Sequence, residues 1–378
     1  MNPYILDSSL LEEFKQAVSD HDDFLITTYG DYRGKNLWNL ICSSKDWLHV
    51  SVNGLPYIQM NHPNDDARSL NVLQLIMAFD LVVQAIEQLY RAFEIENPLN
   101  GDQSVFKQSV TDDIYFAHIR ACFGAHAVAL KSADGSPPPK KSEEKYFASW
   151  SSKTEGTGNY TVYLYSNKPG DEAIPFSLSF VKIHEYIVKR YSLLSNVIRV
   201  IDEKKRDFVK KQRQRKIKRS TDIVVQLQIL LEENSARIGK ETGYQYEIMR
   251  LIELFMAPQE FPAEEKDAVA KYLNLSKLLV DELFEALQNM TYAAEDENSQ
   301  DADDLSHWHL LHPGSNKFKN VFYDISKVFE YLHNPNYNPS LVDHHINRLI
   351  EAEILPSYIN RNTNKLDLQL LLLSNLTQ

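Results

Sequence analysis

Residues 65–93 read DDARSLNVLQLIMAFDLVVQAIEQLYRAF and form the longest stretch of helical spacing in the first half of the chain. Apolar residues recur at intervals of three and four along this stretch and almost encircle it. A helix that is apolar on nearly every side is normally buried in a core. We therefore expect residues 65–93 to form the central helix of a helical domain.

The composition of the chain also favours helices. Its 378 residues include only 12 glycines and 15 prolines, about 7 % of the total, whereas average usage is roughly 12 %. This shortage disfavours a turn-rich sandwich or barrel. A hydrophobic fraction of 43 % excludes a wholly disordered chain. The sequence predicts a mainly α protein.

Further helices are expected on both sides of the central segment. In the first half they cover residues 2–18, 36–52 and 111–130, followed by a long helix from 181 to 201 or as far as 219. In the second half they cover residues 221–233, 244–256, 263–290, 318–332 and 341–353. Three β-branched and aromatic segments, residues 146–151, 160–165 and 174–180, predict a small antiparallel β insertion.

The length of the chain suggests two domains. We place their boundary near Arg219 and Ser220. Residues 1–219 then form a helical domain with the β insertion and a long basic helix, and residues 220–378 form a C-terminal helical domain of unknown role.

Residues 112–130, DDIYFAHIRACFGAHAVAL, hold the most informative group of reactive side chains. Arg120, His118, His126 and Cys122 lie within nine residues of one another on an expected helix. An arginine fork binds two phosphate oxygens, and a histidine exchanges protons near neutral pH. If the substrate is RNA, its own 2′-hydroxyl can be the nucleophile. This pattern favours acid–base chemistry on a phosphodiester.

The segment RACFGAH, residues 120–126, resembles the Arg-x(4–6)-His signature of the HEPN superfamily of helical nucleotide-binding domains. The preceding IEQLYRAF and the later Phe-Ala-Ser-Trp at residues 147–150 add to the likeness, which covers roughly residues 30–210. A group of bacterial proteins of unknown function carries a similar R-A-C-F-G-A-H segment. Many HEPN proteins are metal-independent endoribonucleases of toxin–antitoxin, CRISPR or phage-defence systems, and they act as dimers.

The resemblance implies that Arg120 stabilises phosphate charge and that His126 is the general acid or base. Asp113, His118 and Cys122 then support them, and no cofactor is expected. Arg120 and His126 are six residues apart and do not share a face of a straight helix. They converge only if the helix bends or if a second subunit supplies the partner group.

Other interpretations of the same residues remain open. Arg120 can pair with Asp112, Asp113 or another acid while His126 is an ordinary core residue. His118, Cys122 and His126 share a helical face but extend over roughly 12 Å, so at most two of them can bind one metal ion. Cys122 can be a nucleophile activated by a histidine, or a small buried hydrophobic residue.

A second group of histidines, His307, His309 and His312, follows an acidic loop at residues 295–304. His309 and His312 can ligate a metal together with Asp303 or Asp304 if the segment is helical. The Pro and Gly after His312 favour an ordinary helix end. We interpret residues 343–345, Asp-His-His, as the start of a helix.

Residues 204–219, KKRDFVKKQRQRKIKR, hold ten of the 40 Lys and Arg residues and one of the 52 acidic residues. Such a run can attract a polyanion to an otherwise acidic protein. Alternatively, it is a solvated helix face or pairs with the acidic loop at residues 295–304. The candidates for RNA binding are Lys210, Lys211, Arg213 and Arg215.

These observations lead to one prediction of function and one alternative. The prediction is a cytoplasmic, homodimeric, HEPN-type endoribonuclease, a toxin or phage-defence effector with RNA as substrate and a protein antitoxin or regulator as partner. The alternative is a non-catalytic dimeric sensor that binds RNA or a protein. No phosphate-binding loop, α/β-hydrolase or common zinc-protease motif occurs. The absence of about 18 consecutive apolar residues argues against a membrane span, and the two cysteines exclude a disulfide scaffold.

Overall fold

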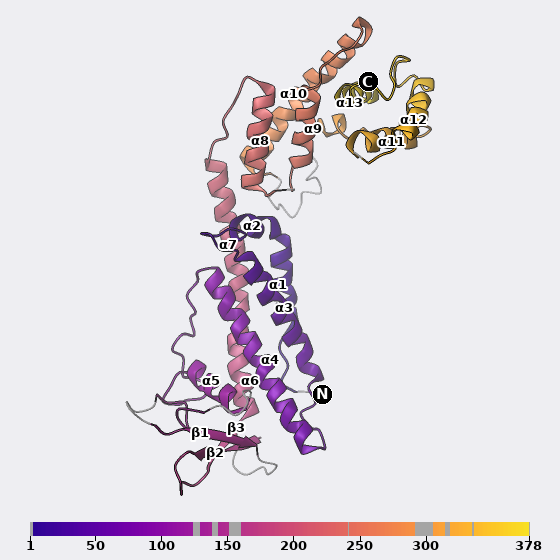
Figure 1. The fold of residues 1–378 in the computed structure, drawn as a ribbon. Coiled ribbons are helices and arrows are strands. Elements are labelled where there is room, and N and C mark those ends of the chain that lie inside the picture. Colours follow the sequence, from indigo (N-terminus) through magenta and orange to yellow (C-terminus); the bar gives the residue numbers. More distant parts are fainter. Residues whose placement is uncertain are drawn as a thin grey trace. The chain divides into compact units, whose positions relative to one another are not determined.

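The computed structural model describes residues 3–123, 129–137, 143–150, 160–240, 242–291, 305–313, 318–334 and 336–377. It is mainly helical with one small three-stranded antiparallel sheet, which confirms the predicted fold class (Figure 1). The chain divides into two compact units, Met1–Lys205 and Arg206–Gln378. This division lies within the basic run, earlier in the chain than the predicted boundary near Arg219 and Ser220.

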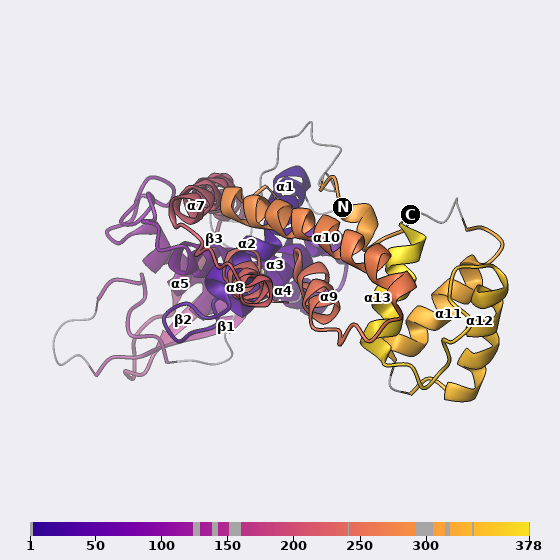
Figure 2. The same ribbon diagram turned by 90° about the horizontal axis from the view of Figure 1, so that it is seen from above.

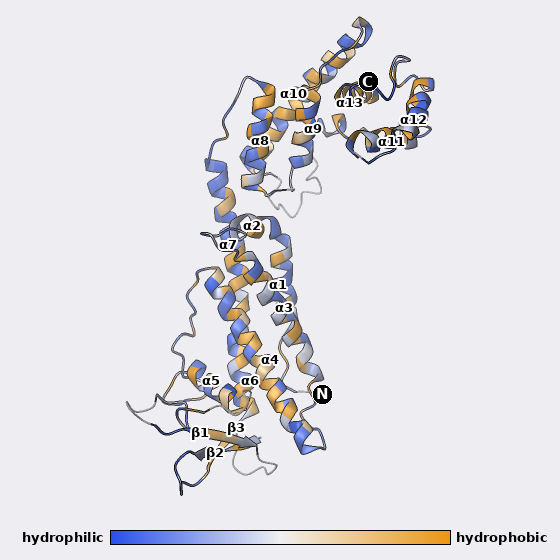
Figure 3. Cartoon of the chain, viewed as in Figure 1, coloured by the Kyte–Doolittle hydropathy of each residue, from blue (hydrophilic) through white to orange (hydrophobic). Residues whose placement is uncertain are grey.

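The first unit is built around the predicted central helix, α4 (Asp65–Ala92). Its buried side chains include Val72, Ile76, Phe79 and Leu89, and it packs against α3 and α6. The helices of the first unit are α1 (Ser8–Asp20), α2 (Asp22–Tyr29), α3 (Trp38–Gly54), α4, α5 (Asp112–Phe123), α6 (Phe180–Tyr191) and the first part of α7 (Leu194–Gln214). The hydropathy colouring of Figure 3 shows the apolar character of α4 along much of its length.

By length and composition, α4 is apolar enough to cross a membrane, although polar residues interrupt its apolar run. Half of its most apolar window of 18 residues is buried inside the protein. The core helix of a soluble protein has the same properties, so α4 is weak evidence for a membrane span.

Hydrogen bonds explain why two predicted helix boundaries were wrong. Helix α1 begins at Ser8 rather than at residue 2, because the Asp7 carboxylate accepts a hydrogen bond from the Ser9 N–H at 2.9 Å and caps the helix. Helix α5 does not run to Leu130, because Leu130 and Tyr146 exchange two backbone hydrogen bonds in an extended bridge.

The long helix predicted from residue 181 is two helices, α6 and α7. The Ser192 hydroxyl donates to the Lys189 carbonyl at 2.9 Å at the end of α6, and the Ser195 hydroxyl donates to the Ser192 carbonyl at 2.7 Å. Serine side chains that bond to nearby backbone in this way compete with the helical pattern. The break between the helices lies at these serines.

The sheet confirms the predicted β insertion and packs against the end of α5. Its strands are β1 (Tyr146–Trp150), β2 (Tyr160–Ser166) and β3 (Ile174–Leu178), with β2 in the centre and both pairings antiparallel. Phe123, the last residue of α5, has its ring centroid 5.9 Å from that of Trp150, 6.4 Å from Tyr160 and 6.0 Å from Phe176. One aromatic side chain thus joins the helix to all three strands.

The second unit has its own hydrophobic core of helices. Beyond the division its helices are α8 (Ile223–Arg237), α9 (Gln245–Phe255), α10 (Ala263–Asn289), α11 (Phe322–His333), α12 (Pro339–Glu351) and α13 (Lys365–Leu376). Figure 2 shows α11 and α12 side by side, and they pack directly on each other. The sequence did not predict α13, because its leucines at residues 370–373 are consecutive, and a short continuous apolar run does not distinguish a helix from a strand.

Arg237, a fully buried arginine of α8, joins the end of α7 to α10 within the second unit. The Arg237 guanidinium donates to the carbonyl oxygens of Gln212, Arg215 and Leu287, at 2.7, 2.6 and 3.3 Å, and its Nε donates to the Glu233 carboxylate at 2.7 Å. A buried arginine with these partners satisfies carbonyls at the C-terminal ends of α7 and α10.

We predict that Arg237→Met destabilises the second unit by about 3 kcal/mol, because the backbone carbonyls of Gln212, Arg215 and Leu287 and the half-buried Glu233 carboxylate lose their donor. Hydrogen exchange of the α8 and α10 amides measures the loss. The matched control is Arg219→Met, whose guanidinium pairs with Asp281 and Glu285 at the surface; it should cost at most about 1 kcal/mol. Equal effects of the two substitutions would contradict the structural role of Arg237.

Candidate active site

Arg120, the proposed phosphate-binding residue, is paired with an acid on the central helix. Its Nη1 donates to both carboxylate oxygens of Asp80, at 3.1 and 2.9 Å. The Asp80 side chain is 12 % exposed, and that of Arg120 is 41 % exposed. Of the acids open as partners, the structure therefore selects one on α4 rather than Asp112 or Asp113. Arg120 is oriented by this pair and still reaches solvent.

Two pairs of charged residues, each spaced by seven, face each other between α4 and α5. Asp80 and Glu87 lie seven residues apart on α4, as do Asp113 and Arg120 on α5. Seven residues are close to two helical turns, so each pair lies on one face. Asp80 contacts Arg120, and Glu87 interacts electrostatically with Asp113. We call these four residues the charged seam; it has one attractive and one repulsive end.

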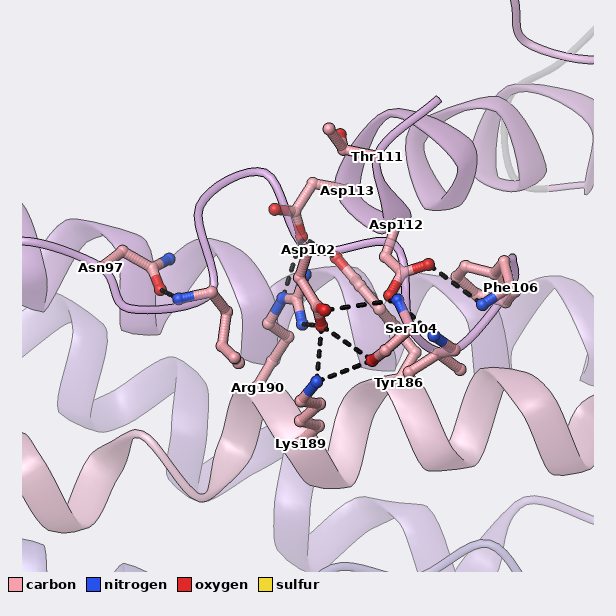
Figure 4. A network of polar contacts seen from close by, with 12 residues as sticks. Asn97, Asp102, Ser104, Phe106, Thr111, Asp112, Asp113, Tyr186, Lys189 and Arg190 are labelled. Atoms are coloured by element: carbon pink, nitrogen blue, oxygen red, sulfur yellow. Dashed lines mark hydrogen bonds and ion pairs between the residues drawn. The ribbon is translucent and has the colours of Figure 1, made fainter. Parts of the chain in front are cut away.

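Arg190 of α6 offsets the repulsion at the second end (Figure 4). Its Nε and Nη2 lie 2.9 and 2.8 Å from the Asp113 carboxylate, and its side chain is only 3 % exposed. The Tyr186 hydroxyl donates to the same carboxylate at 2.7 Å. Asp113 is therefore held in place by α6 rather than free to act on a substrate.

The loop before α5 is attached to the same network. Lys189 donates to the Asp102 carboxylate at 2.6 Å, and this hydrogen bond, opposed by partial burial, lowers the pKa of Asp102 to about 2. Asp112 is fully buried, and its carboxylate accepts the N–H groups of Val105 and Phe106, each at 3.0 Å. Asp112 therefore organises the loop and takes no part in binding Arg120.

Two residues of the seam, Asp80 and Glu87, were not predicted from the sequence, and Glu87 is the one with a shifted pKa. Partial burial raises its pKa, and the carboxylates of Asp113 and Asp80 raise it further, while Arg190 and Arg120 act in the opposite direction. A carboxyl group whose pKa is raised is better suited to proton transfer than one of ordinary pKa. Its seven-residue spacing from Asp80 was a signal in the sequence that could have identified it.

His118 and Cys122 contact each other but form an inert pair. The His118 Nε2 donates to the Ala133 carbonyl at 3.1 Å and lies 3.6 Å from the Cys122 Sγ. Burial lowers the pKa of His118 and raises that of Cys122 to about 12. A neutral thiol beside a neutral imidazole is a poor nucleophile. His126 lies outside the described residues, and so does any metal site that includes it.

Three arginines of the basic run contact the second unit, whereas two of its lysines extend into solvent. Arg213 donates to the Asn289 carbonyl at 2.6 Å, Arg215 pairs with Glu233, and Arg219 lies over the Phe284 ring. Lys210 and Lys211 are exposed and make no ion pair within the described ranges. The acidic loop at residues 295–304, the alternative partner of the run, lies outside the described residues.

The second histidine group does not form a metal site in the part of the chain that the structure describes. The His307 Nδ1 lies 2.7 Å from the Glu282 carboxylate, and the His312 Nε2 lies 3.5 Å from that of Glu247. The His309 Nδ1 bonds to the Ser306 carbonyl. Asp303 and Asp304 are outside the described residues.

An open groove of about 510 Å³ lies on the outer face of α3 and contains none of the predicted site residues. Its lining residues are Asn39, Cys42, Ser43, Asp46, Trp47 and Val50. The candidate site remains the charged seam. No family model, curated protein or solved structure matches the chain.

We predict that Glu87→Gln stabilises the protein at pH 7 and that the gain disappears in acid. The pKa of Glu87 in the folded state is raised above its ordinary value of 4.5, so the folded wild type loses stability as pH rises through and above that value. Because the carboxyl is exposed to solvent, we expect less than about 1 kcal/mol.

Urea denaturation between pH 4 and pH 7 measures this difference. The matched control is Glu96→Gln, because Glu96 is exposed and lies beyond the end of α4. A gain that is the same at both pH values would contradict the assignment of Glu87 to the seam.

Proposed function

We propose that the protein is an endoribonuclease of the HEPN type that cleaves RNA at the charged seam, with Arg120 contacting the scissile phosphate. The observation that supports this is the state of Arg120: Asp80 binds only its Nη1, and 41 % of the side chain is exposed. Its Nη2 and Nε make no hydrogen bond among the described residues. These two nitrogens are the donors offered to a phosphate.

Proton transfer in this proposal belongs to His126 and Glu87. His126 takes its role from the resemblance to HEPN proteins, as general acid or base at the 2′-hydroxyl or the leaving oxygen. Glu87, at the other end of the seam and within electrostatic range of Arg120, adds a carboxyl of raised pKa. The substrate RNA supplies the nucleophile, so the reaction uses no cofactor. The cytoplasmic location, the homodimer and a protein antitoxin or regulator remain part of the same proposal.

We predict that Arg120→Ala lowers RNA cleavage by at least about 100-fold, the usual effect of removing a donor to a developing charge. The matched control is Asp80→Asn, which breaks the same ion pair but leaves the guanidinium in place; cleavage should fall by no more than about tenfold. The measurement is cleavage of tRNA and of a mixed-sequence single-stranded RNA in the presence of a chelator.

The two variants distinguish a phosphate-binding arginine from a structural one. If both lose cleavage equally, Arg120 acts only through its ion pair and the proposal is wrong. His126→Ala should also abolish cleavage while the far-ultraviolet circular dichroism of the protein stays unchanged. Cleavage that survives this change excludes His126 from the reaction.

The exposed lysines of the basic run favour a second candidate, an RNA-binding protein without catalysis. Lys210 and Lys211 point to solvent, while the arginines around them are engaged by α8 and α10. The lysines rather than Arg213 or Arg215 are therefore the expected phosphate contacts.

We predict that Lys210→Gln/Lys211→Gln weakens binding to single-stranded RNA and lowers the slope of log K against log salt by about 1.4, or about 0.7 for each lost contact. Fluorescence anisotropy at several salt concentrations measures the slope. Arg213→Gln/Arg215→Gln removes the same formal charge and should instead destabilise the second unit with little change in slope. A slope that falls in the arginine variant and not in the lysine variant would show that Arg213 and Arg215 are the RNA contacts.

A further inference from the structure

Three metal-ligating side chains meet where α11 and α12 pack together. Asp324 of α11 and His344 and His345 of α12 each offer one ligand atom, and these atoms lie within 4.8 Å of one another. The His345 Nδ1 donates to the Asp324 Oδ1 at 2.8 Å, and the two side chains are only 12 % and 11 % exposed. The group lies within the second unit, far along the chain from the charged seam.

We propose that Asp324, His344 and His345 bind a zinc ion. Two imidazoles and one carboxylate are a donor set that zinc takes in proteins, with a fourth position open to water. Bonds of about 2.0–2.1 Å in tetrahedral geometry place the ligand atoms about 3.3 Å apart. The present separations, from 2.8 Å to at most 4.8 Å, lie on both sides of that value.

Small side-chain movements are enough to complete the site. His344 is exposed, and its ring centroid is 5.3 Å from that of His345. An ion placed between the His345 Nδ1 and the Asp324 Oδ1 replaces the proton that now joins them. Metal binding commonly displaces protons from its ligands in this way.

The charges around the site suit a cation. The Asp324 carboxylate has His345 as its only side-chain hydrogen-bond partner among the described residues. The nearby cations are already paired: Arg361 lies 3.2 Å from Asp343, and Lys327 lies 2.6 Å from Glu330. The arrangement leaves one carboxylate charge for the ion to share.

The exposed histidine separates this proposal from a purely structural explanation. A hydrogen bond between His345 and Asp324 is sufficient to join α11 to α12. It gives no role to His344, whose ring lies beside the pair at the surface. A metal site uses all three side chains and leaves a coordination position facing solvent.

The test uses the full-length protein without an affinity tag, stripped with a chelator and titrated with zinc chloride. Isothermal titration should give one ion per chain with a Kd in the micromolar range or tighter. Cobalt(II) in place of zinc should give the visible absorption of a four-coordinate ion. Asp324→Asn, His344→Ala and His345→Ala should each weaken binding by at least about tenfold.

His333→Ala is the matched control, because it removes a histidine of α11 that lies outside the cluster. It should bind zinc as the wild type does. His344→Ala keeps the hydrogen bond between His345 and Asp324, so its melting temperature without metal should equal that of the wild type. Added zinc should raise the melting temperature of the wild type and not that of His344→Ala.

Three results would overturn the proposal: no binding tighter than about 100 µM, wild-type affinity in His344→Ala, or an equal loss in His333→Ala. None of these readouts depends on RNA cleavage. The zinc site and the proposed ribonuclease activity can therefore fail independently.

Discussion

The buried guanidinium of Arg190 between two carboxylates is the interaction on which the candidate site depends. It binds Asp113 directly and lies 3.6 Å from Asp102, so it ties the first turn of α5 and the preceding loop to α6. Without this positive charge, Asp113 and Glu87 would repel each other at one end of the seam. The opposite end, where Arg120 meets Asp80, is positioned by the same packing of α4 and α5. A residue outside the predicted motif thus holds the first turn of the helix that carries the motif's arginine.

The buried arginines and the exposed lysines of the basic run have different tasks in this protein. Arg190 and Arg237 are almost fully buried and use the planar guanidinium to reach several oxygens at once. Lys210 and Lys211, whose charge sits at the end of a flexible stem, stay in solvent. This separation follows from geometry, since only the guanidinium presents several donors in fixed directions. Counting basic residues in a run therefore overstates the charge that is available to a ligand.

The sequence predicted those parts of the fold that periodic patterns encode. Helix α4 and the three strands were found because apolar spacing and β-branched composition are local properties. Helix α13 was missed because its consecutive leucines do not distinguish a helix from a strand. The partner of Arg120 could not be predicted, because Asp80 lies 40 residues earlier and only packing brings them together. The same limit applies to the ion pair of Arg215 with Glu233, because the two residues lie 18 positions apart in the sequence.

The contacts of the seam require that six residues separate the two charged residues of each helix. One residue inserted between Asp80 and Glu87, or between Asp113 and Arg120, would turn one charge about 100° around its helix and away from its partner. Substitutions at the apolar positions in between can be absorbed by repacking, whereas a change in length cannot. Because of this spacing, the seam tolerates substitutions between its charged residues far better than insertions or deletions.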